Sequence, residues 1–553
     1  MRLGERRVSG ITASPGVAVA AAWQPRRDPT VALASLTADE ETIRDAFATV
    51  ANALLTLAAQ MREKGMREEA AILTAESAIA RDEELLNTAL AAMAEGATAG
   101  AAIGGAGEEF AALLESLDSA YLRERAADIR QVVRRVLLVL AGEHDNAPPP
   151  KPFVMMDADL GPVDLLEVAA QGLVGAVSLR GGVNAHAAIV ARSLGIPLLV
   201  GIDPAELAII DGCDVVLDAD RAVLVIDPSR EARADADRRV AEASSRRERF
   251  ALERDLAPET ADGRRVVLSC NVASAPEVTI GLAARATGVG LLRTELPFLN
   301  AQAWPTESLH RQTLTPVFAQ LDDVPVAVRL MDFSNDKVPP FLTNGLEGLD
   351  ALLDNPDALR AQLAAVLDVG RRAQTRIMLP MVRRPAQVSA VRAELRVMAH
   401  RVGVPEPMLG IMVELPEAVE NAVSLAQVSD FFSLGTNDLT AAVLGLSRAD
   451  QGARPALAAH PKVLACIVAT CKAALAAGIS VSVCGDAGGD PLVLPLLLAA
   501  GVRHFSVSPA RVDEVRYRIR RISMSDWTGR LGDVLRLADA EAVWRYVEAG
   551  SAS

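Results

Sequence analysis

The sequence is poor in cysteine, in aromatic residues and in net positive charge. Its five cysteines are an odd number, and they form no C-x-x-C pair and no cluster with histidine, which indicates neither a disulfide framework nor a zinc site. Aromatic residues make up 3% of the chain, and 56 basic against 71 acidic side chains give a formal net charge of −15. A chain of this balance is poorly suited to coat nucleic acid, so we expect no nucleic-acid partner.

The sequence also lacks a long hydrophobic run. The most apolar stretches, such as residues 492–502, fall short of the about 18–20 residues that a membrane-spanning helix needs. The first residues, Met1 to Arg7, contain no apolar segment of the kind found in signal peptides. We therefore expect no membrane insertion and a cytoplasmic protein.

What the chain does contain is enough apolar material for several folded domains. Half of its 553 residues (50%) are hydrophobic and 23% are charged, which is typical of a globular protein rather than a disordered one. At about 100–200 residues per domain, a chain of this length should contain three or four domains.

Hydrophobic periodicity changes along the first part of the chain. Residues 8–23 alternate small and apolar side chains around Ser14-Pro15-Gly16, which predicts a strand, a turn and a second strand. Apolar residues then recur every three or four positions over residues 37–141, which predicts a helical bundle. The prolines at 148–150 end this pattern. Short β-like runs alternate with helical stretches over residues 153–228, which indicates a compact α/β layer.

The second half of the chain has the pattern of a barrel. Residues 229–256 are dense in charged residues and alanine, as expected of a solvated helix that joins two domains. Eight strand-like runs follow, each with a helical stretch after it: 266–269, 288–292, 324–329, 376–379, 409–413, 431–434, 480–483 and 504–507. This alternation is typical of a (β/α)8 barrel, whose active site lies at the C-terminal ends of the strands. The residues after these runs are mostly polar: Asn271, Arg293, Arg329, Asp332, Glu414, Asn437, Asp438, Cys484, Asp486 and Ser508.

These polar residues suggest one kind of chemistry. Glu414 and Asp438 offer hard carboxylate oxygens of the kind that Mg²⁺ takes together with substrate phosphate. Arg293 and Arg329 offer planar cations suited to phosphate and carboxylate oxygens. Together they indicate a site for a small, highly anionic metabolite bound to a metal. The alternative for each residue alone is a salt bridge at the barrel top, and for Cys484 a packed free thiol.

A histidine follows a Gly-Gly turn at the start of an apolar helix. Gly181-Gly182 leads to His186, where free N–H groups and the helix dipole favour a neutral imidazole and stabilise an anion placed on it. A histidine that attacks a phosphoryl group and then carries it needs both properties. The alternative is a capping or surface histidine.

Several segments, in one order over about residues 8–522, carry motifs of a known family. They are Gly10 to Gly16, Tyr121 to Arg130, residues 181–197, Gly288 to Glu295, Gly410 to Glu414, Phe432 to Thr440 and Cys484-Gly485. Together they resemble Enzyme I of the phosphoenolpyruvate:sugar phosphotransferase system, and residues 181–197 are similar to its phosphohistidine motif.

The resemblance implies a multidomain α/β protein. It would contain a swivelling phosphohistidine α/β domain (residues 1–28 and 145–228) with an inserted helical bundle (29–144), which binds a carrier protein. A helical linker (229–258), a phosphoenolpyruvate-binding (β/α)8 barrel (259–525) and a C-terminal tail (526–553) would follow.

The resemblance also implies a phosphoryl relay. The phosphoryl group of phosphoenolpyruvate would pass to His186 in a Mg²⁺-dependent step that leaves pyruvate, and then to the carrier protein HPr for sugar uptake. Glu414 and Asp438 would hold Mg²⁺, and Cys484 would protonate the enolate. The substrate would be held by Arg293, Arg329, Asn437, Asp438 and Arg448. The family is a homodimer through its barrels.

The chain departs from the family's pattern near the expected site. Asn184-Ala185 replaces Thr-Ser before the histidine, and Ser334-Asn335 replaces a Gly-Gly pair. Glu347 and Asp350 stand where the family has arginines, and a carboxylate facing a phosphate would weaken binding. Two further departures lie in the helical insert, at Glu76 in place of histidine and Gln131 in place of aspartate.

Three hypotheses follow. The first is a working Enzyme I whose pocket tolerates these changes with the help of Lys337 and Arg360, and we favour it because the other site residues are present. The second is a family member with an impaired barrel that acts as a phosphoacceptor or a regulatory binding protein. The third, a relative of pyruvate-phosphate dikinase or phosphoenolpyruvate synthase, would need a nucleotide-binding domain, and no Gly-rich phosphate loop precedes Phe153.

Overall fold

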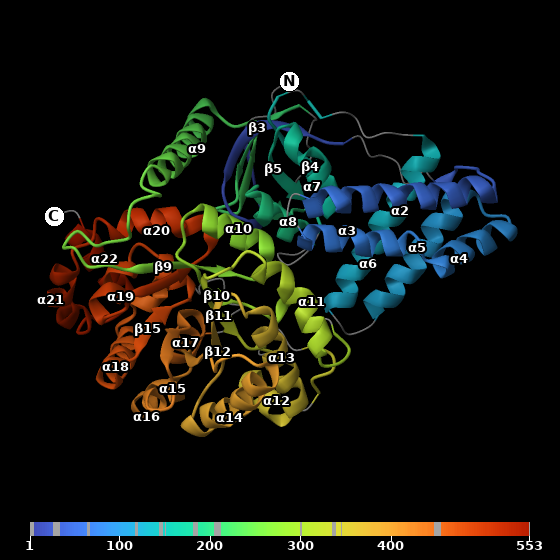
Figure 1. Cartoon of the computed structure of the whole chain (residues 1–553). Helices are drawn as coiled ribbons and strands as arrows, with labels where there is room; N and C mark the ends of the chain where they lie inside the picture. The colour runs from blue at the N-terminus through green and yellow to red at the C-terminus, as the bar shows by residue number, and fades with distance from the viewer. Residues whose placement is uncertain are drawn as a thin grey trace. The chain divides into compact units, whose positions relative to one another are not determined.

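The computed structural model describes residues 5–25, 34–63, 67–116, 120–142, 148–149, 151–180, 186–203, 212–298, 301–333, 339–343, 345–446 and 455–551. The chain divides into two compact units, Met1–Ser245 and Arg246–Ser553 (Figure 1). The boundary falls inside one helix, α9 (Arg230–Ala251), which occupies most of the predicted linker.

The first unit is built on an eight-stranded mixed sheet with the strand order β1-β8-β7-β3-β4-β5-β6-β2. The strands are β1 (Arg6–Ser9), β2 (Ile11–Ser14), β3 (Val17–Trp23), β4 (Phe153–Asp157), β5 (Leu173–Ser178), β6 (Leu198–Val200), β7 (Asp214–Asp218) and β8 (Val223–Ile226). The prediction of two strands over residues 8–23 was wrong, because the segment forms three strands that pair with different partners. Strand β6 was not predicted, since three apolar residues give no periodic signal.

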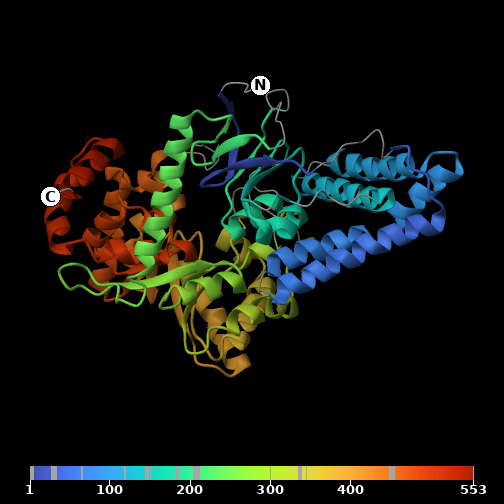
Figure 2. The same ribbon diagram turned by 90° about the horizontal axis from the view of Figure 1, so that it is seen from above.

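The helical bundle is an insertion between two neighbouring strands. β3 pairs in parallel with β4, although more than a hundred residues separate them in the sequence. In the described part of this stretch lie the helices α2 (Glu40–Glu63), α3 (Arg67–Ile79), α4 (Glu83–Ala94), α5 (Ala99–Ser116) and α6 (Ala120–Ala141). The helices of this insertion are coloured blue to cyan in Figure 2. Ile43, Phe47, Val50 and Leu54 recur every three or four positions along α2 and are buried, which confirms the helical periodicity. The short helices α7 (Pro162–Val168) and α8 (His186–Leu194) complete the α/β domain.

The second unit contains a closed barrel of eight parallel strands, and its closing pair is β16 with β9. The strands are β9 (Val267–Val272), β10 (Val289–Leu292), β11 (Pro325–Arg329), β12 (Gln374–Leu379), β13 (Met408–Val413), β14 (Phe431–Leu434), β15 (Ser480–Val483) and β16 (His504–Val507). Each of the eight predicted runs overlaps one of them, so the barrel prediction is confirmed. Alternate side chains of barrel strands point inward and fill the interior.

Helices cover the outside of the barrel. They are α10 (Ala275–Ala283), α11 (Glu307–Phe318), α12 (Gly348–Asp354), α13 (Pro356–Val369), α14 (Pro385–Val402), α15 (Pro416–Glu420), α16 (Ala422–Ala426), α17 (Thr436–Leu444), α18 (Pro461–Ala477), α19 (Leu494–Ala500) and α20 (Val512–Ile519). A large apolar cluster packs between strands and helices, and a separate small cluster of Leu291, Ala327, Met378, Met412, Phe431 and Cys484 lies on the other side of the strands. Gly410 makes room there for the ring of Phe431, which would lie 2.5 Å from a β-carbon at position 410.

The residues predicted as a C-terminal tail are two packed helices, α21 (Met524–Val534) and α22 (Ala540–Ser551). Trp527, Val534 and Val543 are buried in the apolar cluster of the barrel unit. The indole N–H of Trp544 donates to the carbonyl of Ala456 at 2.9 Å. Apolar residues recur at helical spacing here, at Trp527, Leu531 and Val534 and again at Val543 and Val547, so the sequence carries a periodic signal that the prediction of a tail left unused.

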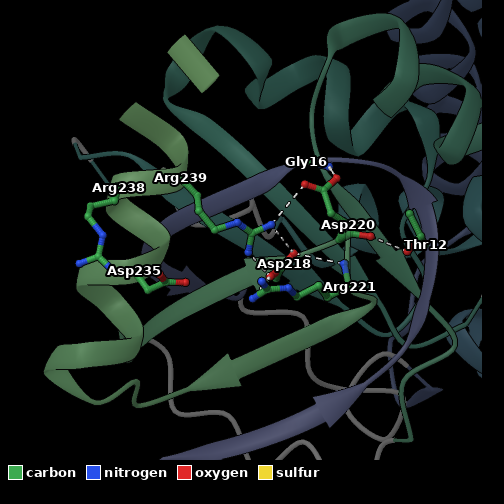
Figure 3. Close-up of polar contacts among 9 residues, drawn as sticks. Thr12, Gly16, Asp218, Asp220, Arg221, Asp235, Arg238 and Arg239 are labelled. Carbon is green, nitrogen blue, oxygen red and sulfur yellow. Dashed lines mark hydrogen bonds and ion pairs between the residues drawn. The ribbon is translucent and has the colours of Figure 1, made fainter. Parts of the chain in front are cut away.

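The linker helix α9 is attached to each unit by its own set of contacts. In the first unit, Arg239 forms ion pairs with Asp218 and with Asp220, whose carboxylate also accepts the backbone N–H of Gly16 at 2.8 Å (Figure 3). In the second unit, the ring of Phe250 packs on Tyr517 of α20 at 4.9 Å between centroids. Ala236 is the buried residue of α9 and the rest of the helix is exposed or half-buried, as its composition predicts.

No helix in the described part of the chain is both long and apolar enough to cross a bilayer.

One buried histidine makes the barrel unit sensitive to acid. His310 on α11 is 0% exposed, packs edge-on against Phe298, and finds no hydrogen-bond partner for either ring nitrogen among the described residues. Burial lowers its pKa from 6.5 to about 4. In the unfolded chain this histidine takes up a proton near pH 6.5, whereas in the folded chain it stays neutral until about pH 4. The free energy of unfolding therefore decreases as the pH falls from 6.5 toward 4.

We predict that His310→Leu removes this loss. Between pH 7 and pH 4.5 the variant should lose about 2–3 kcal/mol less free energy of unfolding than the wild type, as measured by chemical denaturation. His400→Gln, at an exposed position of α14, is the control and should keep the wild-type acid sensitivity. Equal losses in His310→Leu and wild type would contradict the buried neutral state of His310.

Candidate active site

A cavity of about 450 Å³ lies at the C-terminal ends of the barrel strands. Its lining includes six residues that the sequence placed in one site: Arg293, Arg329, Glu414, Asn437, Asp438 and Cys484. Parallel strands in a closed barrel direct all their carboxyl ends to the same face, which is why residues far apart in the sequence meet here. Arg448 lies outside the described residues. His186 is the first residue of α8 in the other unit, and residues 181–185 before it are also outside the described part.

Arg329 is buried and held between two carboxylates. Its guanidinium donates to Glu295 Oε1 at 2.5 Å and pairs with Asp332 Oδ2 at 2.8 Å, and the side chain is 7% exposed. Burial alone would lower its pKa, but the negative charges of Glu295, Asp332 and Glu414 outweigh that effect and raise it. Arg329 is therefore a permanent cation with a fixed orientation at the cavity wall.

A buried amide links the two strands that carry the arginines. Gln362 on α13 is 0% exposed, and its Nε2 donates to Thr294 Oγ1 at 2.9 Å while its Oε1 accepts the N–H of Met331 at 3.1 Å. Thr294 Oγ1 in turn donates to the carbonyl of Arg329 at 2.8 Å. Glu295 and Gln362 were not among the predicted site residues, because a buried polar residue in a helix or loop has no periodic signature.

Glu414 combines burial with one unused oxygen. Its Oε1 accepts the backbone N–H of Met381 at 2.7 Å, while Oε2 is buried and has no hydrogen-bond partner among the described residues. Burial, with the charges of Asp332 and Asp438, raises its pKa to about 8, and Arg329 partly opposes this rise. A bare, buried carboxylate oxygen beside a second carboxylate, Asp438, fits a hard divalent cation.

The described residues hold no group of three or more His, Cys, Asp or Glu side chains arranged to bind a metal. Glu414 and Asp438 would thus supply only part of a coordination shell. Mg²⁺ commonly keeps one or two carboxylates and completes its shell with water and substrate phosphate. The donor set therefore fits Mg²⁺ bound together with a phosphorylated substrate better than a structural metal.

Asn437 is fixed by a neighbour at the cavity rim. Its Nδ2 donates to Asp486 Oδ2 at 2.8 Å, and its Oδ1 accepts the backbone N–H of Asp486 at 3.0 Å. This reciprocal pair joins the start of α17 to the turn after β15. It leaves one amide hydrogen and one oxygen lone pair of Asn437 for a ligand.

Cys484 is a buried thiol in the same cavity. It is 3% exposed, and its sulfur accepts the hydroxyl of Ser433 at 3.2 Å. Burial raises its pKa to about 11, although the Ser433 hydrogen bond acts in the opposite direction. Asn271 donates its Nδ2 to the Cys484 carbonyl at 2.8 Å, which fixes the backbone at this turn. The geometry supports a protonated thiol that can donate its proton.

The two acidic departures from the family's pattern are not among the described residues that line the cavity. Asp350 accepts Nε2 of Gln387 at 2.7 Å and pairs with Arg383 at 3.4 Å. Glu347 is the residue that precedes α12, with extended backbone angles. The expected carboxylate against a phosphate is therefore absent from the described cavity wall.

Lys337 and Arg360 were expected to offset the acidic departures from the family's pattern in the substrate pocket. Arg360 forms a bidentate ion pair with Glu394 at 2.8 and 2.9 Å between α13 and α14, and it does not line the cavity in the described part of the chain. The expectation for Arg360 was wrong, because the helical position directs it to the neighbouring helix. Lys337 lies outside the described residues.

Family models for phosphoenolpyruvate-utilising enzymes match three parts of the chain. The phosphoenolpyruvate-binding domain matches residues 247–524, the N-terminal domain residues 9–125 and the mobile domain residues 149–222.

Named relatives match over nearly the whole chain. A "Multiphosphoryl transfer protein" from Xanthomonas campestris pv. campestris is 34% identical over 98% of this chain and 67% of its own length. A "Phosphoenolpyruvate-protein phosphotransferase" from Geobacillus stearothermophilus is 30% identical over 98% of both chains. Among solved structures, an NMR structure of Enzyme I (nEIt) is 25% identical over 43% of this chain and 99% of that chain, with a TM-score of 0.34.

We predict that Cys484 reacts slowly with iodoacetamide. With a pKa of about 11, only about one thiol in a thousand is ionised at pH 8, against about one in ten at the ordinary pKa of 9.0. The native rate should therefore be at least about 100-fold below the rate in urea, as followed by peptide mass analysis. Half-buried Cys466 is the internal comparison and should react faster. Rapid labelling of native Cys484 would contradict a protonated, buried thiol.

Proposed function

Because this chain belongs to the phosphoenolpyruvate-utilising enzymes and is a phosphoenolpyruvate-protein phosphotransferase, we propose how its residues divide the reaction. The barrel cavity binds phosphoenolpyruvate with Mg²⁺, and His186 accepts the phosphoryl group. The observation that carries this proposal is the meeting, in one cavity, of a fixed buried cation, Arg329, with the bare carboxylate oxygen of Glu414.

The charges of the cavity suit a highly anionic substrate. Arg293 and Arg329 pair with phosphate and carboxylate oxygens, and Asn437 adds a neutral hydrogen bond. Glu414 and Asp438 hold Mg²⁺, which neutralises phosphate charge when it is bound. Since phosphoryl transfer depends mainly on positioning and electrostatic stabilisation, the pre-set orientation of Arg329 is its main contribution. Arg448 is proposed as a further substrate contact.

Two residues react directly with the substrate: His186 takes its phosphoryl group, and Cys484 gives it a proton. The neutral imidazole of His186 attacks phosphorus, so a P–N bond forms and the bond from phosphorus to the enol oxygen breaks. The electron pair of that bond stays on oxygen and leaves an enolate. The thiol of Cys484 gives its proton to the enolate carbon, which yields pyruvate, and the thiolate regains a proton from water. A pKa of about 11 keeps the thiol loaded with its proton at neutral pH.

The next acceptor is proposed from the family alone. An HPr-type phosphocarrier takes the phosphoryl group from His186, and the helical insert (α2–α6) is the proposed docking domain. A homodimer through the barrels and a location in the cytoplasm belong to the same proposal. The changes at Glu76 and Gln131 lie in this insert, and Glu76 is 1% exposed, so its effect on docking would be indirect.

The cavity favours a working enzyme over the alternative of an impaired barrel. Asp350, one of two carboxylates that replace arginine, pairs with Arg383, which offsets its charge. The retained residues supply cations, carboxylates, an amide and a thiol to one cavity. The two hypotheses differ in one result, the phosphorylation of the protein by phosphoenolpyruvate.

We predict that purified protein incubated with phosphoenolpyruvate and Mg²⁺ gains one acid-labile phosphoryl group, measured by intact mass before and after mild acid. His186→Ala should gain none, because it lacks the nucleophile. His400→Gln, at the exposed position on α14, is the matched control and should be labelled like the wild type. Label retained in His186→Ala would overturn the assignment of the carrier, and no label in the wild type would favour the impaired barrel.

We also predict that Asp486→Ala raises the KM for phosphoenolpyruvate by about tenfold or more, because Asn437 loses a charge-assisted hydrogen bond that orients it. Asp486→Asn keeps a carbonyl oxygen as acceptor and should restore most of the affinity. Asp526→Ala, on α21, is the control with unchanged KM. Equal KM values in all three variants and the wild type would contradict the role of Asp486.

A further inference from the structure

The backbone donor that holds Glu414 comes from a residue with an unusual conformation. Met381 follows β12 by two positions and has φ +52°, in the left-handed region that residues with a side chain seldom adopt. Its N–H donates to Glu414 Oε1 at 2.7 Å, and the residue is 7% exposed. A strained backbone of this kind persists only where its surroundings hold it, and such residues concentrate at functional sites.

The start of α12 holds Met381 in place. Gly348, the first residue of α12, also has a positive φ of +52°, and a β-carbon there would lie 2.7 Å from both Cβ and Cγ of Met381. Only glycine leaves room for this contact. The N–H of Gly348 donates to the carbonyl of Phe333 at 3.0 Å, which anchors the start of α12 to the segment after β11.

A second set of contacts joins α12 to the loop that follows Met381. Asp350 accepts Nε2 of Gln387 and pairs with Arg383. Gln387 Oε1 accepts the backbone N–H groups of Arg383 at 2.8 Å and Arg384 at 3.0 Å. Asn421 donates its Nδ2 to the carbonyl of Arg383 at 2.9 Å. Both the N–H groups and a carbonyl of this loop are thus held by side chains of other elements. These hydrogen bonds restrict the neighbouring Met381 to its observed conformation.

Glu414 is enclosed from the other side as well. A β-carbon at Gly435 would lie 2.8 Å from Glu414 Cβ and 2.9 Å from Oε2. The carboxylate is therefore confined between the Met381 N–H and the backbone of Gly435. In the described part of the chain Oε1 accepts one hydrogen bond and Oε2 accepts none, so the two oxygens differ in what they can still bind.

We propose that Met381 is a positioning residue of the metal site: its left-handed backbone, held by Gly348, directs its N–H to one oxygen of Glu414 and leaves the other oxygen for the cation. The inference rests on the proposed function, in which Glu414 holds Mg²⁺. It also gives α12, which contains Asp350, a structural connection to the metal site.

The test compares two side chains of similar size that differ in backbone preference. Asparagine tolerates the left-handed region, whereas β-branched valine strongly disfavours it. Mn²⁺ binding is measured by electron paramagnetic resonance in the His186→Ala background, with and without phosphoenolpyruvate, since that protein cannot consume it. Met381→Val should raise the Mn²⁺ Kd by about tenfold or more, the loss usual for a partner that orients a metal ligand. Met381→Asn should stay within about threefold of the parent protein.

The matched control carries the same strain far from the cavity. Arg285 has φ +58° and precedes β10, at the opposite end of the barrel from the cavity. Arg285→Val should leave the Mn²⁺ Kd unchanged, and thermal unfolding of every variant checks its fold. If Met381→Val does not fold, Gly348→Ala provides the second variant, because its methyl group displaces Met381 from outside the metal site.

The outcomes separate this inference from the proposed function. Glu414→Gln binding Mn²⁺ as tightly as the parent protein would overturn the metal assignment and the inference with it. Loss of Mn²⁺ binding in Glu414→Gln together with unchanged binding in Met381→Val would overturn the positioning role alone. Weaker binding in Met381→Val, with Met381→Asn and Arg285→Val unaffected, supports it.

Discussion

The burial of one positive charge, that of Arg329, constrains the whole barrel top. A guanidinium removed from water must be paired with negative charge. Here one guanidinium nitrogen lies 2.5 Å from Glu295 Oε1 and another lies 2.8 Å from Asp332 Oδ2. Glu414 contributes a third negative charge to its surroundings. Because charges this close in a buried site influence one another strongly, the orientation of Arg329 and the properties of Glu414 cannot be set independently.

This constraint explains why much of the supporting structure is polar and buried. Thr294 and Gln362 bind backbone and side-chain groups around Arg329, and every one of those hydrogen bonds lies inside the barrel unit. Such a network is costly when it is incomplete, which ties the cavity to the packing of α13 behind it. The chemistry of the cavity thus depends on residues that never line it.

Asp350, an acidic residue expected where the family has an arginine, has a structural place in this arrangement. It joins α12 to Arg383 of the loop after β12, and that loop carries the N–H that binds Glu414. Its carboxylate is paired with Arg383 on the same loop. A carboxylate near an anion-binding cavity can be accommodated when the fold directs it to a neighbouring cation.

The fold was largely predictable because it follows from local patterns. Eight strand and helix repeats, a 3.6-residue periodicity over 37–141 and three prolines in a row are properties of short windows of sequence. The three-stranded N-terminus, the short strand β6 and the packed helices α21 and α22 were missed. The strands are too short for periodicity to reveal them, whereas the apolar residues of α21 and α22 do recur at helical spacing and could have been recognised.

The candidate site, like the fold, was predictable from the sequence only in part. The sequence by itself determined which charged residues follow barrel strands, because the C-terminal ends of parallel strands must share one face. Only the tertiary structure decided that Gln362 reaches Thr294, that Asp350 turns to Arg383, and that the Met381 N–H meets Glu414. Contacts of this kind join residues of different strands and helices, and their direction depends on backbone angles and packing that no local pattern encodes.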